Sequence, residues 1–166
     1  RTLSGDEILV QGGTYLENLI IDKEVALKSL DFLEPATIDG SSTNLSTVSV
    51  SNTLEQINIE IDGIIITGGE AVGGGIYLPH GNLYLRNAVV TKNSSIGHGG
   101  GIFIGALASL QLDNSLVVYN ETGSGDTFGA GIYADGGSVT MINSIVFFNR
   151  RKNSVGINFN LNGYSG

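Results

Sequence analysis

Aromatic side chains recur at equivalent places in this sequence, and aromatic rings set in a row can stack on sugar rings or on a partner protein. Tyr77, Phe103 and Tyr133 each follow an isoleucine that ends a glycine-rich word. If these words open β-strands, the isoleucine points inward and the ring outward, because successive side chains face opposite sides of a strand. The three rings are the first candidates for a binding face, unless they stack on one another or are covered by loops.

A second outward row is expected beside the asparagine that ends a later strand of each repeat. It contains Lys92, Tyr119 and Phe148. Together the two rows give a candidate binding face, and the partners that suit such a face are glycans and protein surfaces. Its aromatic members are Tyr77, Phe103, Tyr133, Tyr119 and Phe148.

Acidic residues that could act in catalysis or hold a metal ion are dispersed along the chain. Asp62, Arg86 and Asp113 are expected at one position of three adjacent coils, where their alternating charges reduce repulsion between stacked coils. Glu121 and Asp126, in the longest insertion, could hold Ca²⁺, although this ion takes about six to eight oxygen ligands and would need backbone carbonyls as well. We assign no catalytic residue and no cofactor beyond this candidate Ca²⁺ ion.

Two short words, repeated about every 25 to 30 residues, would position these side chains. One is Gly-Gly-Gly-Ile with variants, and its Gly-Ile junction begins at residues 75, 101, 131 and 156. The other ends in asparagine at residues 93, 120 and 149. A period of this length made of short strands indicates a solenoid. The sequence therefore predicts an all-β, single-stranded right-handed parallel β-helix of about six coils.

The predicted solenoid occupies residues 1–166 as a single domain, with N-terminal coils over 6–56 and regular repeats over 57–160. In the early coils the apolar pattern predicts strands at 8–10, 18–21, 25–30, 36–38 and 48–50, with a turn at Gly12-Gly13. The chain opens on Arg1 and stops in mid-pattern, which suggests a piece of a longer protein.

Stacking the coils converts each repeat into columns of like residues about 4.8 Å apart. The glycines before each isoleucine should adopt positive φ or stand where a Cβ has no room. One asparagine column, Asn93, Asn120 and Asn149, is expected to end its strands in the left-handed conformation, with amides hydrogen-bonded along the stack. A second asparagine column, which begins the following strand, is Asn87, Asn114 and Asn143. The inward aliphatic columns are Ile76, Ile102, Ile132 and Ile157, and then Leu78, Ile104, Ala134 and Phe159.

Composition narrows the range of functions. The net charge of −8 comes from 16 acidic and 8 basic residues without a basic stripe, which argues against a nucleic-acid partner. The one basic run, Arg150-Arg151-Lys152, is typical of a solvated turn. Cysteine is absent, which excludes disulfides, and no apolar run is long enough to span a membrane.

The N-terminal stretch reads Val10-Gln11-Gly12-Gly13-Thr14-Tyr15-Leu16-Glu17-Asn18-Leu19-Ile20-Ile21, followed by Val25-Ala26-Leu27 and Thr37-Ile38-Asp39-Gly40. This wording resembles the opening coils of the pectin-lyase-like superfamily of right-handed parallel β-helices. From Gly73 onward, the glycine and asparagine words are similar to repeats of bacterial surface β-helices such as polymorphic outer-membrane proteins. Because that superfamily includes lyases, hydrolases, esterases and proteins without catalysis, the resemblance implies a fold rather than one activity.

These observations favour a non-catalytic β-helix segment of a secreted or surface-exposed bacterial protein, which adheres to glycan or protein through a flat solenoid face. Its expected location is outside the cell or on the cell surface. Two alternatives stay open. The chain could be a polysaccharide-active enzyme, either a lyase or a glycoside hydrolase, whose acidic site is completed by residues that the sequence does not pair. It could also polymerise end to end into an extracellular filament, because an open coil end is an unpaired edge.

Overall fold

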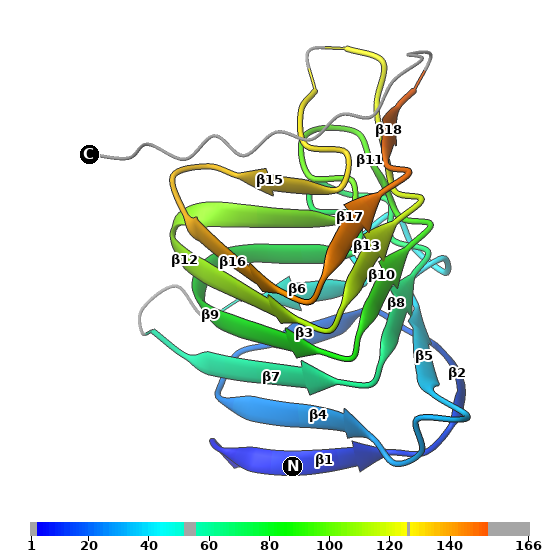
Figure 1. The fold of residues 1–166 in the computed structure, drawn as a ribbon, viewed down its shortest axis with the longest axis vertical. Coiled ribbons are helices and arrows are strands. Elements are labelled where there is room, and N and C mark those ends of the chain that lie inside the picture. Colours follow the sequence, from blue (N-terminus) through cyan, green and yellow to red (C-terminus); the bar gives the residue numbers. More distant parts are fainter. Residues whose placement is uncertain (1–2, 52–55, 126, 153–166) are drawn as a thin grey trace.

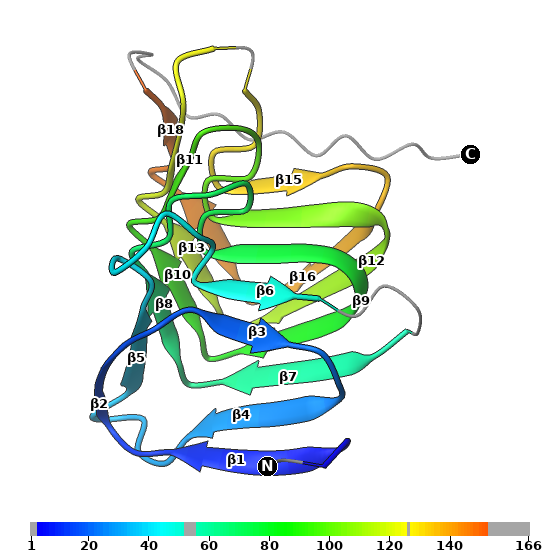
Figure 2. The ribbon, with the colours of Figure 1, turned by 180° about the vertical axis from the view of Figure 1, so that it is seen from behind.

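The computed structural model describes residues 3–51, 56–125 and 127–152 of the 166-residue chain. The described residues form strands, turns and loops, with no helix among them. The strands pair in parallel and stack as successive coils of a right-handed solenoid (Figures 1 and 2). The predicted all-β parallel β-helix is confirmed, but it has about five turns in place of the expected six.

Successive coils contribute strands to three main faces. The front face, toward the viewer in Figure 1, contains β1 (Asp6–Val10), β4 (Val25–Ser29), β7 (Asn58–Asp62), the second halves of β9 (Ile76–Arg86) and β12 (Ile102–Asp113), and β16 (Ser138–Ile142). The back face, toward the viewer in Figure 2, contains β3 (Leu19–Ile21), β6 (Val48–Val50), the first halves of β9 and β12, and β15 (Ile132–Ala134). Because β9 and β12 bend through both faces, front and back form one continuous sheet.

The third, or side, face is a separate sheet on the right of Figure 1. Its strands are β2 (Gly13–Leu16), β5 (Ala36–Asp39), β8 (Ile65–Thr67), β10 (Val89–Thr91), β13 (Leu116–Val118) and β17 (Ile145–Phe147). Beyond the side face, three short strands extend the later coils and form a small sheet of their own. They are β11 (Ser94–Ser95), β14 (Glu121–Thr122) and β18 (Arg150–Arg151).

The core consists of columns of like side chains that the parallel register creates. On the front face Ile59 pairs with Leu83, and Leu83 pairs with Leu110. These side chains are almost fully buried, and each such burial stabilises the fold by about 1.5–3 kcal/mol relative to exposure. On the back face the predicted inward columns are confirmed for Ile76, Ile102 and Ile132 and for Leu78, Ile104 and Ala134, while Ile157 and Phe159 lie outside the described residues.

The first coil contains one strand where the sequence predicts a turn. Gly13 begins β2, which pairs residue by residue with β5. The apolar pattern misses this strand because Tyr15 is its one half-buried side chain, while Leu16 is exposed. The Tyr15 hydroxyl then donates a hydrogen bond to the backbone oxygen of Gln11 at 2.9 Å, which ties the strand to the turn before it.

The glycines of the Gly-Gly-Gly-Ile word meet two different backbone requirements. A Cβ at Gly100, the second glycine of its word, would overlap the backbone carbonyl oxygens of Glu121 and Ala130 in the next coil. The first glycine of each word has a positive φ instead. These φ values are 63°, 68° and 63° at Gly73, Gly99 and Gly129. Both predicted reasons for the glycine runs, a positive φ and a lack of room for a Cβ, are therefore confirmed, each at a different position of the run.

Asn93, Asn120 and Asn149 form a buried ladder along the corner that follows the side face. The backbone N–H and the side-chain amide of Asn93 both donate to Oδ1 of Asn120, at 3.1 and 3.0 Å. Asn120 makes the same two bonds to Oδ1 of Asn149, both at 2.9 Å. Each amide also donates to a main-chain carbonyl, as Asn120 does to Val90 at 3.0 Å. The ladder thus satisfies polar groups that water cannot reach.

The expectation that these ladder asparagines adopt the left-handed conformation is wrong. The chain turns one residue earlier, because the asparagine must direct its amide into the coil while the residue before it takes the positive φ. Those residues are Lys92, Tyr119 and Phe148, with φ of 54°, 58° and 52°. The asparagines that do adopt positive φ form the other column, at the corner between front and side faces, namely Asn87, Asn114 and Asn143 with φ of 46°, 50° and 48°.

The close approach of coils at Gly100 predicts the effect of adding one methyl group there. Gly100→Ala should lower the free energy of unfolding by about 1–3 kcal/mol, because the backbone of Glu121 and Ala130 in the next coil must shift. Urea unfolding followed by circular dichroism measures this. Gly125→Ala is the matched control, since a Cβ at Gly125 meets nothing within 4 Å. Equal stability of the two variants would contradict the predicted overlap.

The asparagine ladder predicts a larger loss when its middle member is truncated. Asn120→Ala removes the Oδ1 that accepts from the backbone N–H of Asn93 and the amide that donates to the carbonyl of Val90, while the Oδ1 of Asn149 keeps the backbone N–H of residue 120. Each buried polar group left without a partner costs about 1–3 kcal/mol. We expect the free energy of unfolding to fall by about 3 kcal/mol or more, measured by the same urea titration. Asn44→Ala, in an exposed loop, should change it by less than about 0.5 kcal/mol. A loss below about 1 kcal/mol for Asn120→Ala would argue against the ladder.

Candidate functional site

The first aromatic row lies on the back face, on β9, β12 and β15. The register pairs Phe103 with both Tyr77 and Tyr133, so the three rings occupy one column. Ring centroids are 5.2 Å apart between Tyr77 and Phe103 and 5.8 Å apart between Phe103 and Tyr133. Each side chain is half-buried. The rings point outward as expected, and they also stack on one another along the column.

Two rings that the sequence did not suggest close the upper end of this row. His98 stacks on Tyr133 with centroids 4.4 Å apart, and on Phe128 with centroids 5.6 Å apart. The Nδ1 atom of His98 accepts a hydrogen bond from the backbone N–H of Phe128 at 3.0 Å. A sequence signal for both existed, since each stands directly before the first glycine of its word.

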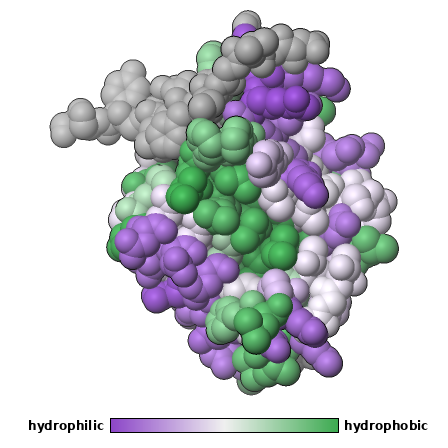
Figure 3. All heavy atoms as spheres, turned by 45° about the vertical axis from the view of Figure 1, so that its right-hand side comes forward, coloured by the Kyte–Doolittle hydropathy of each residue, from purple (hydrophilic) through white to green (hydrophobic). Residues whose placement is uncertain are grey.

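The second row lies on the corner beside the side face and is more open. Tyr119 and Phe148 are 58% and 53% exposed, and their rings stack with centroids 5.2 Å apart and an angle of 11°. Phe147, the last residue of β17, adds a third ring 4.0 Å from that of Phe148. Figure 3, which turns the side face toward the viewer, shows hydrophobic residues gathered in a band along it.

The charged triplet on the front face is in register but does not pair as expected. Asp62 lies beside Arg86, and Arg86 beside Asp113. The guanidinium of Arg86 nevertheless pairs with Glu60 at 3.4 Å, and Asp62 accepts a hydrogen bond from the Asn87 amide at 2.7 Å. Each of these side chains therefore pairs with a residue on the neighbouring coil that is offset along the strand, and not with the residue directly beside it in register. Arg86 is held by a carboxylate on the neighbouring coil rather than directed at a substrate.

Of the two residues of the candidate Ca²⁺ site, Glu121 can be described, and its contacts give no support to the site. Asp126 lies outside the described residues. Glu121, on β14, pairs with Arg150 of β18, with Nε and Oε2 2.7 Å apart. Within the described ranges, no three His, Cys, Asp or Glu side chains come close enough to hold a metal ion.

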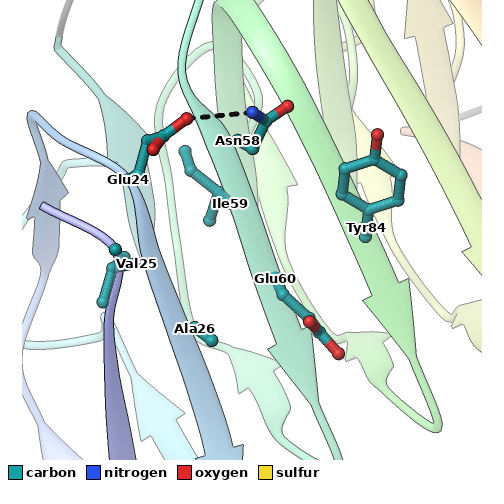
Figure 4. A pocket seen from close by; sticks show the side chains of 8 residues that line it. Glu24, Val25, Ala26, Asn58, Ile59, Glu60 and Tyr84 are labelled. Carbon is teal, nitrogen blue, oxygen red and sulfur yellow. Dashed lines mark hydrogen bonds between the residues drawn. The ribbon is translucent and has the colours of Figure 1, made fainter.

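A hollow of about 270 Å³ opens on the front face across β4, β7 and β9 (Figure 4). It forms because one outward column contains a short side chain between longer ones. The register places Ala26 between Glu7 and Glu60, and Tyr84 follows Glu60. Ala26 leaves space at the bottom, and Glu60 and the ring of Tyr84 line one side. Sequence periodicity alone did not single out this interruption.

Polar side chains on the opposite side of the hollow hold one another in place. The Asn58 amide donates to a carboxylate oxygen of Glu24 at 2.9 Å, as drawn in Figure 4. The Asn58 oxygen in turn accepts from Asn82 at 3.0 Å, and the Asn82 oxygen accepts from the Ser109 hydroxyl at 2.6 Å. This run of bonds crosses four coils. It fixes the Glu24 carboxylate and the Asn58 amide on one side of the hollow. Together with Glu60 and Tyr84 on the other side, they form a lining suited to a ligand with several hydroxyl groups.

The charges around the hollow are mostly negative. The cation nearest along β4 is Lys28, which forms an ion pair with Glu7 at 2.7 Å. The hydrogen bond to Glu7 raises the pKa of the Lys28 ammonium group above its ordinary value of 10.5, and the charges of Glu60 and Asp62 raise it further. Lys28 and Arg86, the two Lys or Arg residues on the described front-face strands, thus have carboxylate partners.

Comparison with known proteins finds no matching family model, no matching curated protein and no matching solved structure. No stretch of the described chain forms a helix that could cross a bilayer.

The raised pKa of Lys28 predicts a pH-dependent contribution to stability. A group whose pKa is higher in the folded state stabilises the fold fully below its unfolded pKa, and this contribution disappears as pH rises through the folded pKa. The difference in free energy of unfolding between the native chain and Lys28→Met should therefore be constant at neutral pH and shrink above about pH 10.5. Urea unfolding across this range measures it. The exposed Lys92→Met is the control, and the same trend there would contradict a role for the Glu7 pair.

Proposed function

We propose that this chain is a rigid, non-catalytic solenoid segment of a secreted or cell-surface bacterial protein, and that it binds neutral glycans through its front face. The observation that carries the proposal is the hollow above Ala26. A saccharide ring presents hydroxyl groups around its edge and C–H groups on its faces, and the hollow offers a partner for each. Tyr84 supplies an aromatic surface for the C–H groups, and Glu24, Glu60 and Asn58 supply acceptors for the hydroxyls.

The size and stiffness of the hollow support a small ligand unit. Its volume of about 270 Å³ lies just below the range of about 300–1,000 Å³ typical of small-molecule sites, which suits one sugar unit of a longer chain. The strands beneath it are fixed by buried Ile59 and Leu83. A ligand would therefore meet groups that are already in position, and little ordering would oppose binding.

Charge favours a neutral glycan over an acidic one. Two carboxylates line the hollow, and Lys28 and Arg86 are already paired with carboxylates. A uronate would bring a further negative charge to this surface. Lys28 and Arg86 would do little to neutralise that charge, because they already pair with carboxylates. The alternative of a polysaccharide lyase or hydrolase stays a prediction.

Membership of the pectin-lyase-like superfamily, with a closer relationship to bacterial surface β-helices, is part of the same proposal. Its support is the parallel coil fold together with the sequence of Val10–Ile21 and the repeated glycine and asparagine words. The extracellular location follows from that relationship.

End-to-end assembly remains a second candidate, on one observation. Inward side chains of the first coil, among them Ile8 and Leu19, are half-buried and line an apolar hollow of about 140 Å³. A further strand stacked on β1 would cover them.

The front-face proposal predicts different effects of removing two tyrosines. Tyr84→Ala should weaken binding of a neutral oligosaccharide about tenfold, because it removes the aromatic wall of the hollow, whereas Tyr77→Ala on the back face should leave binding unchanged. Screening neutral and uronate oligosaccharides on an array, followed by calorimetric titration of the best one, measures this. Glu60→Gln tests the carboxylate at nearly constant volume.

Two results would overturn the proposal. One is a loss of binding with Tyr77→Ala but not with Tyr84→Ala, which would move the site to the back-face row. The other is a preference for uronates over neutral oligosaccharides.

A further inference from the structure

The corner between the side face and the small sheet carries the most exposed aromatic cluster described above. Ile145 and Phe147, which point outward from β17, are 55% and 41% exposed. Tyr119 and Phe148 project beside them from the turn that follows the side-face strands. Exposed apolar side chains gathered in this way mark an interaction site more often than isolated ones do. We call this group, with the cations described below, the aromatic–basic corner.

Backbone conformation indicates that these aromatic residues are not present for the fold alone. The positive φ at Tyr119 and Phe148 strains any residue with a bulky side chain, and asparagine or glycine would relieve that strain. The neighbouring left-handed column contains glycine and asparagine, at Gly63, Asn87, Asn114 and Asn143. A bulky ring kept at a strained position points to a role for the ring itself.

Positive charge is concentrated at the same place. Four of the eight basic residues of the chain, which has a net charge of −8, either continue the column of Tyr119 and Phe148 or lie within four residues of Phe148. Lys92 continues the column of Tyr119 and Phe148, since the residues before them are paired in register. The others follow Phe148 closely in sequence and are Arg150, Arg151 and Lys152. Glu121, paired with Arg150, is the carboxylate that partly offsets them, and residues 138–152 contain no acidic residue.

We infer that the aromatic–basic corner docks on the surface of an anionic lipid bilayer. The rings would enter the boundary between headgroups and acyl chains, and the cations would contact the headgroup phosphates. This requires two signals, an apolar one and a basic one, because either alone gives only marginal attachment. The corner supplies both on successive turns of the solenoid.

The geometry favours a bilayer over an anionic glycan. Sugar recognition by stacking needs a free ring face, and Tyr119 and Phe148 each cover one face of the other, with ring centroids 5.2 Å apart. Phe147 crowds the Phe148 ring at 4.0 Å. Ring edges and the Ile145 side chain remain exposed, and these suit insertion into an apolar medium. Figure 3 shows the hydrophobic band of the side face with strongly hydrophilic residues at its upper end.

The absence of tryptophan from the chain makes a direct test of insertion simple. Phe147→Trp introduces a single fluorophore at the corner, and Leu33→Trp introduces one at a remote, 92% exposed site. Each protein is titrated with vesicles of phosphatidylcholine alone and of phosphatidylcholine mixed with phosphatidylglycerol. We expect a blue shift of the Phe147→Trp emission with the anionic vesicles only, reversed by high salt, and no shift for Leu33→Trp.

Two further variants separate the apolar contribution from the basic one, with binding measured by vesicle co-sedimentation. Arg151→Gln with Lys152→Gln should reduce binding to anionic vesicles at least about tenfold, at roughly fivefold per cation. Phe147→Thr with Phe148→Asn should reduce it to a similar extent, and asparagine suits the positive φ at 148. Leu33→Ser is the matched control and should bind as the native chain does. The unfolding midpoint of each variant verifies that it is folded.

Three outcomes would overturn the inference. They are equal binding to neutral and anionic vesicles, an equal loss with Leu33→Ser, and failure to bind vesicles together with binding to a soluble polyanion such as dextran sulfate. The last result would assign the corner to an anionic glycan. If the double phenylalanine variant failed to fold, the charge variant and the fluorescence shift would still decide between these outcomes.

Discussion

Stacking in parallel register is the constraint on which the rest of this structure depends. Each coil must place a side chain directly over its counterpart in the next coil, at one strand spacing, so every position has to tolerate contact with a copy of its own kind. Aliphatic side chains meet this condition by packing, as at Ile76, Ile102 and Ile132. Asparagine meets it because its amide carries both a donor and an acceptor, and can bond an identical group above and below. Glycine meets it where two backbones need the space.

Features that follow from this constraint could be predicted from the sequence. The solenoid, the inward isoleucine columns and the outward position of Tyr77, Phe103 and Tyr133 all repeat with the coil, and repetition is visible in one sequence. Features that depend on turn geometry were harder to locate. The left-handed residue was expected at Asn120 and lies at Tyr119, because a period specifies which residues stack and not where between them the chain turns. The predicted count of about six coils included repeats up to residue 160, and the last of these lies outside the described residues.

The candidate site could not be predicted because it arises where the repetition fails. The hollow exists because Ala26 has a short side chain in a column of longer ones. Reading the sequence for repeated residues does not reveal a position that departs from the repeat. Pairing across a diagonal was equally hidden, because the reach of Arg86 to Glu60 depends on side-chain length rather than on column position. The solenoid therefore separates two tasks. Residues that repeat from coil to coil stabilise the fold, and outward residues that do not repeat give each face a different surface chemistry.

The asparagine ladder also bears on how a chain of this kind can change its length. Each rung bonds the next in an identical way, so removal or duplication of one whole coil between equivalent rungs would leave every remaining rung with a partner. Tyr84 of the front hollow lies on an earlier coil than Tyr119 and Phe148 of the aromatic–basic corner. A coil gained or lost between Tyr84 and Tyr119 would alter the separation of the hollow from these two rings by about 4.8 Å. Such a solenoid can act as a molecular ruler, in which evolution adjusts the distance between two surfaces in whole steps.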